Sequence, residues 1–192
     1  MLNFGKTDII SKSAEVFLSL GFSLVQINGK TAYELGGSYF KFSLVKSLNS
    51  YVIESADSLS DAKKNLYEDS DLIPADTDED NILTRLRELL TMYYADTIIN
   101  KIKQMLISKG FVEKVVTNAF RSETNYVLGD LYCIPQYVKS LGFLIEYAHS
   151  HTEAKNHGHE DGDSFPLNIG EDEILNGIEK EIDENILYHG SR

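Results

Sequence analysis

A tandem repeat is the feature of this sequence that most constrains its fold. Residues 51–90 and 143–182 align without gaps at an offset of 92, and 14 of the 40 aligned pairs are identical. Unrelated segments of ordinary composition would share about two or three. The repeat therefore predicts two copies of one structural unit.

The match extends upstream with small shifts of register. Val45–Leu48 corresponds to Val138–Leu141 at an offset of 93, and Gly21-Phe22 corresponds to Gly110-Phe111 at an offset of 89. The repeat thus covers nearly the whole chain. We expect repeat units at 1–94 and 95–192, and because units of this size bury little apolar surface alone, we expect them to pack together as one pseudo-symmetric body.

Hydrophobic periodicity predicts the same order of elements in each copy. In copy one, the apolar positions from Ile9 to Leu20 predict a helix, and Asn28-Gly29 between FSLVQI and TAYEL predicts a hairpin with a type I′ turn. YFKFSLV and YVIESA are typical of strands with one buried face. We expect a short helix capped by Ser58 or Ser60, then an acidic loop, EDSDLIPADTDED, then an amphipathic helix from Asn81.

Copy two repeats this order, with four strands expected between Phe111 and Ala148. No Gly or Pro interrupts residues 81–109, which predicts a long helix joining the copies. The predicted fold class is therefore α+β: a tandem duplication in which each copy is a four-stranded antiparallel meander with helices on one face.

The net charge limits the classes of partner. The 192 residues include 18 Lys+Arg and 30 Asp+Glu, which gives a formal charge of −12. Such a surface repels nucleic-acid phosphates and anionic lipids and attracts basic proteins. We expect neither nucleic acid nor membrane as a partner.

Cysteine usage and hydropathy favour a cytoplasmic protein. The single cysteine, Cys133, excludes an internal disulfide and a cysteine-based zinc site. The first residues, MLNFGKTDIISKSAEVF, lack the basic and apolar regions of a signal peptide. The longest uncharged stretch, Val16–Gly29, has 14 residues and is too short to span a bilayer.

Acidic residues common to both copies are the candidate binding residues. Two interpretations remain open for them: turn and capping chemistry within the fold, or contact with a basic partner. Glu54 and Glu146, which also recur, could pair with Lys63 and Lys155 or face a partner. The recurring acidic positions are Glu68, Asp69 and Asp71 in copy one and Glu160, Asp161 and Asp163 in copy two.

Metal and cofactor chemistry finds weak support. Asp76 and Asp78 with Asp80 resemble the start of a calcium loop, but the required glycine and the final glutamate are missing. Four histidines near carboxylates could hold a transition metal, although copy one has no histidine at these positions. They are His149, His151, His157 and His159. We expect no cofactor and no metal of the shared design.

The sequence offers no pattern typical of an enzyme. It contains no phosphate-binding glycine-rich loop and no G-x-S-x-G motif. Cys133 aligns with Phe40, which favours a core residue over a nucleophile. We therefore expect a protein that acts by binding.

Two segments carry a family resemblance. The pattern Y-V-I-E-x-A-x5-A-K-x-N-x2-E-D-x-D spans Tyr51–Asp71, and F-L-I-E-Y-A-x5-A-K-x5-D-G-D spans Phe143–Asp163. These strand–helix–acidic-turn patterns resemble a family of short immunity proteins from bacterial polymorphic-toxin systems. The resemblance covers both copies, whereas the family usually has a single copy per chain.

The resemblance implies a cytoplasmic inhibitor that binds a cognate toxin and occludes its active site. A basic toxin such as a nuclease would suit the charge of −12. The toxin-binding residues would be the recurring acids, with Asp57, Asp76, Asp78 and the histidine segment setting specificity. We expect a monomer or a weak homodimer. The alternatives are a non-catalytic scaffold module and a metal- or ligand-sensing regulator.

Overall fold

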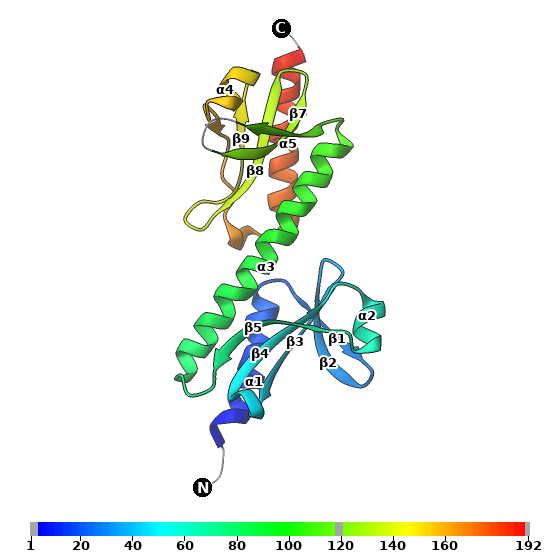
Figure 1. The fold of residues 1–192 in the computed structure, drawn as a ribbon, viewed down its shortest axis with the longest axis vertical. Coiled ribbons are helices and arrows are strands. Elements are labelled where there is room, and N and C mark those ends of the chain that lie inside the picture. Colours follow the sequence, from blue (N-terminus) through cyan, green and yellow to red (C-terminus); the bar gives the residue numbers. More distant parts are fainter. Residues whose placement is uncertain (1–3, 118–120, 191–192) are drawn as a thin grey trace. The chain divides into compact units, whose positions relative to one another are not determined.

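The structure is a computed structural model that describes residues 4–117 and 121–190. The chain divides into two compact units, Met1–Tyr94 and Ala95–Arg192. Within the described residues, five α-helices accompany two open, five-stranded antiparallel sheets (Figure 1). The protein is thus α+β, as the sequence predicts.

The first unit contains one sheet with the strand order β1-β2-β3-β4-β5. All four pairings are antiparallel. Its elements are α1 (Phe4–Ser19), β1 (Ser23–Ile27), β2 (Lys30–Leu35), β3 (Ser38–Val45), the 3-10 helix η1 (Lys46–Leu48), β4 (Ser50–Ala56), α2 (Leu59–Lys64), β5 (Glu68–Pro74) and the first part of α3 (Glu79–Ser108).

Local sequence explains the first hairpin and the short helix. Asn28 and Gly29 have φ angles of 52° and 73°, the positive values that a type I′ turn requires. Ser58 caps α2, because its hydroxyl accepts the N–H of Asp61 at 3.1 Å. Both predictions are confirmed.

Helices cover both faces of the first sheet, which corrects the prediction of helices on one face. On one face, the Phe17 ring of α1 stacks on Tyr33 of β2 at 3.9 Å between centroids. The adjacent residue of β2, Ala32, packs with Ala62 of α2. Consecutive strand residues point to opposite faces, so α2 lies on the face opposite α1. The small side chains of Ala32 and Ala62 let α2 approach that face closely.

Each sheet has a fifth strand where the sequence suggested an acidic loop. β5 pairs with β4 over six residue pairs, from Ser50 opposite Pro74 to Ser55 opposite Glu68. Ile73 of β5 is 2% exposed and anchors this edge strand in the core. The many acidic residues of this segment hid the strand pattern, in which a single position is buried. The backbone N–H and C=O groups of β4 on this side need hydrogen-bond partners, and β5 supplies them.

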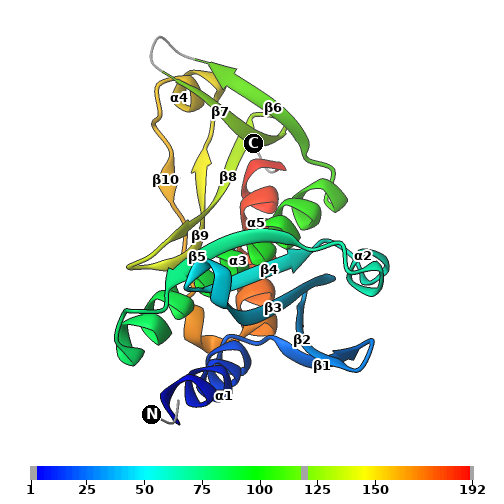
Figure 2. The same cartoon turned by 60° about the horizontal axis from the view of Figure 1, so that its bottom comes forward.

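The second unit contains a sheet with the order β10-β9-β8-β7-β6. β10 lies beside β9 at one edge (Figure 2). Ser150 caps the short helix by accepting the N–H of Glu153 at 3.2 Å. The elements are the second part of α3, β6 (Val112–Thr117), β7 (Ser122–Leu128), β8 (Leu131–Val138), β9 (Gly142–Ala148), α4 (His151–Lys155), β10 (Glu160–Asp161), the 3-10 helix η2 (Leu167–Ile169) and α5 (Glu171–Gly190).

The long helix α3 belongs to both units and supplies a core to each. Leu86 and Leu90 are fully buried in the first unit, and Ile98 and Ile102 are fully buried in the second. The uninterrupted helix predicted over residues 81–109 is confirmed. In the described part of the chain, no helix is both long and apolar enough to cross a membrane.

Candidate functional site

In the first unit, the predicted binding acids lie on and after the edge strand β5. Glu68 is exposed at the start of β5, and Asp71 is half-buried. The hydroxyl of Tyr93 donates to Oδ2 of Asp71 at 3.3 Å, so this carboxylate also has a structural role. The backbone of Asp69 lies opposite Glu54, but the Asp69 side chain falls outside the described residues.

Asp76 and Asp78 follow in the turn before α3, and both are exposed. Asp78 caps the helix, because its Oδ1 accepts the N–H of Asn81 at 3.0 Å. The hydrogen bonds from Asn81 lower the pKa of Asp78. Asp78 therefore has a structural role as a helix cap, whereas Asp76 shows no such role and stays a candidate binding residue.

In the second unit, the acidic segment 160–163 forms β10 and the residues that follow it. The side chains of Glu160, Asp161 and Asp163 are all exposed. The segment is held to β9 by the antiparallel pairing of β10 with that strand. In addition, the N–H of Gly162 donates to the Ile145 carbonyl at 2.9 Å. The structure thus presents Glu160 and Asp161 on the edge strand and Asp163 just beyond it.

Like charges face each other across the outer strands of the second sheet. Asp161 of β10 lies opposite Glu146 of β9. In the first unit the corresponding backbone positions, Asp69 and Glu54, are also opposite one another. Burial raises the pKa of Glu146, and the nearby carboxylates of Asp161 and Glu123 raise it further, against the opposing effect of Arg121. Like charges directly opposite one another cost stability, and this repulsion favours an external cation.

The two units differ in how they treat this glutamate. In β3, Lys41 lies opposite Glu54. The Lys41 ammonium also lies 3.2 Å from the centroid of the Tyr67 ring and donates to Asn65 Oδ1 at 3.0 Å. In the second unit, the residue opposite Glu146 is Ile134. Glu54 thus has a lysine opposite it on the neighbouring strand, whereas Glu146 has an isoleucine at that position.

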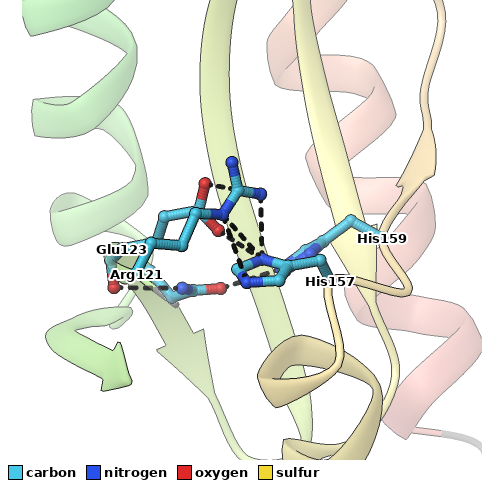
Figure 3. Close-up of polar contacts among 5 residues, drawn as sticks. Arg121, Glu123, His157 and His159 are labelled. Carbon is cyan, nitrogen blue, oxygen red and sulfur yellow. Dashed lines mark hydrogen bonds and ion pairs between the residues drawn. The ribbon is translucent and has the colours of Figure 1, made fainter. Parts of the chain in front are cut away.

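A histidine cluster, drawn in Figure 3, lies near Glu146. We use this name for Arg121, Glu123, Asn125, His157 and His159. Glu123 Oε2 lies 2.8 Å from Nδ1 of His157, and Arg121 Nε lies 3.1 Å from its Nε2. The Nη2 atom of Arg121 also lies 2.9 Å from Nδ1 of His157. Arg121 also pairs with Glu123 Oε1 at 3.0 Å.

The other half of the cluster is more deeply buried. His159 Nε2 lies 3.0 Å from Oδ1 of Asn125, whose side chain is fully buried. Burial lowers the pKa of His159, and positive charge on His157 and Arg121 lowers it further, against the opposing effect of Glu123. Sequence analysis missed Arg121, Glu123 and Asn125; the detectable signal was Asn125 aligned with Ala32, a polar residue where copy one has a small apolar one.

The four candidate metal-binding histidines do not converge. His157 and His159 belong to the histidine cluster, His149 contacts His189 with ring centroids 4.5 Å apart, and His151 lies 3.4 Å from the Tyr132 hydroxyl. Over residues 4–117 and 121–190, no group of three His, Cys, Asp or Glu side chains could hold a metal ion.

A buried carboxyl also escaped sequence analysis. Glu181 of α5 is 8% exposed and lies near Tyr147 of β9 and Cys133 of β8. Burial raises the pKa of Glu181 to about 7, and it also raises the pKa of the Cys133 thiol. Cys133 is fully buried, which agrees with the core position expected for it. The signal in the sequence was Glu181 aligned with the apolar Leu89.

Comparison with family models, with curated proteins and with solved structures found no match to this chain.

Proposed function

We propose that this protein is an immunity protein, a non-catalytic inhibitor that binds a cognate bacterial toxin in the cytoplasm and occludes its active site. The toxin is a basic protein, such as a nuclease, whose cationic groups seat against the acidic strand edges. We propose further that the chain arose by tandem duplication of one such unit. The gapless alignment of residues 51–90 with 143–182 supports this origin.

The observation that carries the proposal is the like-charge pair at the edge of the second sheet. Natural sheets avoid carboxylates directly opposite one another because the repulsion costs stability. Here Asp161 faces Glu146, and Asp69 occupies the matching position opposite Glu54. A lysine or arginine of a partner placed between two such carboxylates would remove the repulsion on binding. The arrangement favours association with a cationic protein.

The overall charge supports the same conclusion. A protein of formal charge −12 attracts a basic partner over long range, and such steering raises association rates at low salt. In an inhibitor of a nuclease, the carboxylates take the place of substrate phosphates. An open edge strand adds unpaired backbone groups to the interface.

The test is co-expression with the product of the adjacent gene, scored by growth rescue and co-purification. An immunity protein is expected to be encoded beside its toxin and to restore growth. Triple reversal of Glu160, Asp161 and Asp163 to lysine, or of Glu68, Asp69 and Asp71, is expected to lower the association rate more than tenfold at low salt.

The matched control reverses three exposed acids away from the strand edges: Glu15→Lys, Asp96→Lys and Asp130→Lys. It changes the net charge equally, so a selective effect of the edge variants separates local contact from long-range attraction. If the association rate fell equally in the edge variants and in the control, the strand edges would not be part of the interface. Co-purification without growth rescue would favour the scaffold alternative.

A further inference from the structure

The second unit buries a carboxyl group where the aligned position of the first buries a leucine. Glu181 is 8% exposed, and its aligned residue Leu89 is 5% exposed. A carboxyl group loses hydration in such a place and is retained only against a cost in stability. The surroundings of Glu181 show what this group does.

Glu181 holds the backbone of the acidic segment 160–163. Its Oε1 accepts the N–H of Asp163 at 3.1 Å. Gly162 passes so close that a Cβ atom there would lie 1.8 Å from the same oxygen. Within the described chain, Oε2 of Glu181 and the hydroxyl of Tyr147 are buried without a hydrogen-bond partner of good geometry.

The groups that face Glu181 do not supply a positive charge. Tyr147 and Cys133 approach from the sheet, Asp163 approaches from the acidic segment, and Glu184 lies one turn away on α5. Each of these is neutral or negative at neutral pH. Burial and the nearby carboxylates of Asp163 and Glu184 disfavour an ionised Glu181, and together they outweigh the hydrogen bond from the Asp163 N–H, which favours it.

Lys109, just after the end of α3, contacts α5 but does not neutralise Glu181. Lys109 Nζ lies 2.6 Å from Asp183 and 3.1 Å from Glu179. These residues are two positions to either side of Glu181, and helix geometry directs them away from it.

We propose that Glu181 is a pH-sensitive latch, which holds the acidic segment 160–163 against the second unit while its carboxyl is protonated and loosens that segment when it ionises. Protonation removes the buried charge and its repulsion by Asp163. When the carboxyl ionises, the cost of its buried charge is relieved if residues 162–163 move away and water reaches the carboxylate. Burial, which raises the pKa of Glu181 to about 7, places this change near neutral pH.

The consequence for binding rests on the proposed function, because the segment carries Glu160, Asp161 and Asp163. The conformational change itself needs no partner. It is therefore tested on the isolated chain, and its failure leaves the proposed function standing.

Hydrogen–deuterium exchange of the peptide spanning residues 158–165 tests the latch. Rates are measured between pH 5.5 and 8 and corrected for intrinsic amide exchange. In the wild-type chain, protection of this peptide is expected to fall about tenfold or more as pH rises. The reason is that Glu181 ionises more readily when the segment is open than when it is closed, so a higher pH favours the open form. Constant protection across this range would overturn the proposal.

Glu181→Gln, which cannot ionise, is expected to show no pH dependence in this peptide. Glu173→Gln, an exposed control on the same helix, is expected to retain the wild-type response. An unchanged pH response in Glu181→Gln would assign the effect to another group and reject the latch. Should this variant fail to fold, carbon-13 NMR titration of the wild-type glutamates decides: a Glu181 midpoint near 7 supports the latch, and one below 5 rejects it.

Discussion

The backbone of Gly162 lies against the carboxyl of Glu181 so closely that any larger residue would overlap it, with a Cβ atom placed 1.8 Å from Oε1. This contact joins the acidic edge of the second sheet to a helix on its core side. It couples a surface segment to a buried titratable group. Residue 162 must be small, because a Cβ atom there would also lie 2.8 Å from the backbone carbonyl oxygen of Ile145.

Glu181 makes the stability of the second unit depend on pH. Its pKa is raised from 4.5 to about 7 in the folded chain, mainly by burial. Between these values the folded state binds more protons than the unfolded state, so the free energy of unfolding falls as pH rises. The shift corresponds to a loss of about 3 kcal/mol between pH 4.5 and 7. Urea denaturation is expected to show this loss in the wild-type chain but not in Glu181→Gln; identical pH profiles would contradict it.

His159 produces a dependence of opposite sign. Burial lowers its pKa, so the folded state resists a proton that the unfolded state accepts below about pH 6.5. Stability is therefore expected to be present above pH 6.5 and to decrease as pH falls below it. Thermal unfolding of His159→Tyr, which introduces the residue of the aligned position Tyr67, is expected to lack this decrease. His151→Asn, at an exposed position, is the control that should keep it.

Gly177 in α5 is required by the ring of Phe165. A Cβ atom at residue 177 would lie 2.1 Å from Cε1 of Phe165, whose backbone is fixed by two hydrogen bonds to Phe143. Gly177→Ala is expected to destabilise the second unit by about 1–3 kcal/mol, although alanine is the better helix former. Denaturant unfolding measures the loss.

Two further variants isolate the cause at Gly177. Asn176→Ala, at the neighbouring exposed position, is expected to be neutral or slightly stabilising. Adding Phe165→Ala to Gly177→Ala should cost less than the sum of the single variants, since the overlap is then gone. Strict additivity would show that the ring is not the obstacle.

Ser150 stabilises α4 through its cap. Its hydroxyl accepts the N–H of Glu153 at 3.2 Å, so Ser150→Ala is expected to lower stability by about 1 kcal/mol. Ser140→Ala, in the exposed turn between β8 and β9, serves as the control and should change stability by less than about 0.5 kcal/mol. Chemical denaturation followed by circular dichroism compares the two.

Local signals predicted the elements whose conformation depends on neighbouring residues. The Asn28-Gly29 turn and the Ser58 cap follow from short-range geometry, and each appears where the sequence placed it. The strand β5 was missed because its assignment depends on pairing with β4, from which α2 separates it, and on a single buried position at Ile73. The face occupied by α2 was missed for a similar reason.

The candidate site shows the same division. Sequence placed acids in both copies, but it did not reveal that Asp161 faces Glu146 or that Asp78 is a helix cap. The contacts within the histidine cluster join β7 to the segment after α4, more than 30 residues away in sequence. No periodicity or spacing records such a pairing.

By itself, the sequence determined the order of most elements, the main turns and caps, and the strongly negative charge, because backbone preference and hydrophobic periodicity act between near neighbours. The tertiary structure alone decided which strands form the sheet edges, which charges face one another and why Glu181 is buried. These properties depend on strand register and helix packing, which bring together residues that the chain keeps far apart.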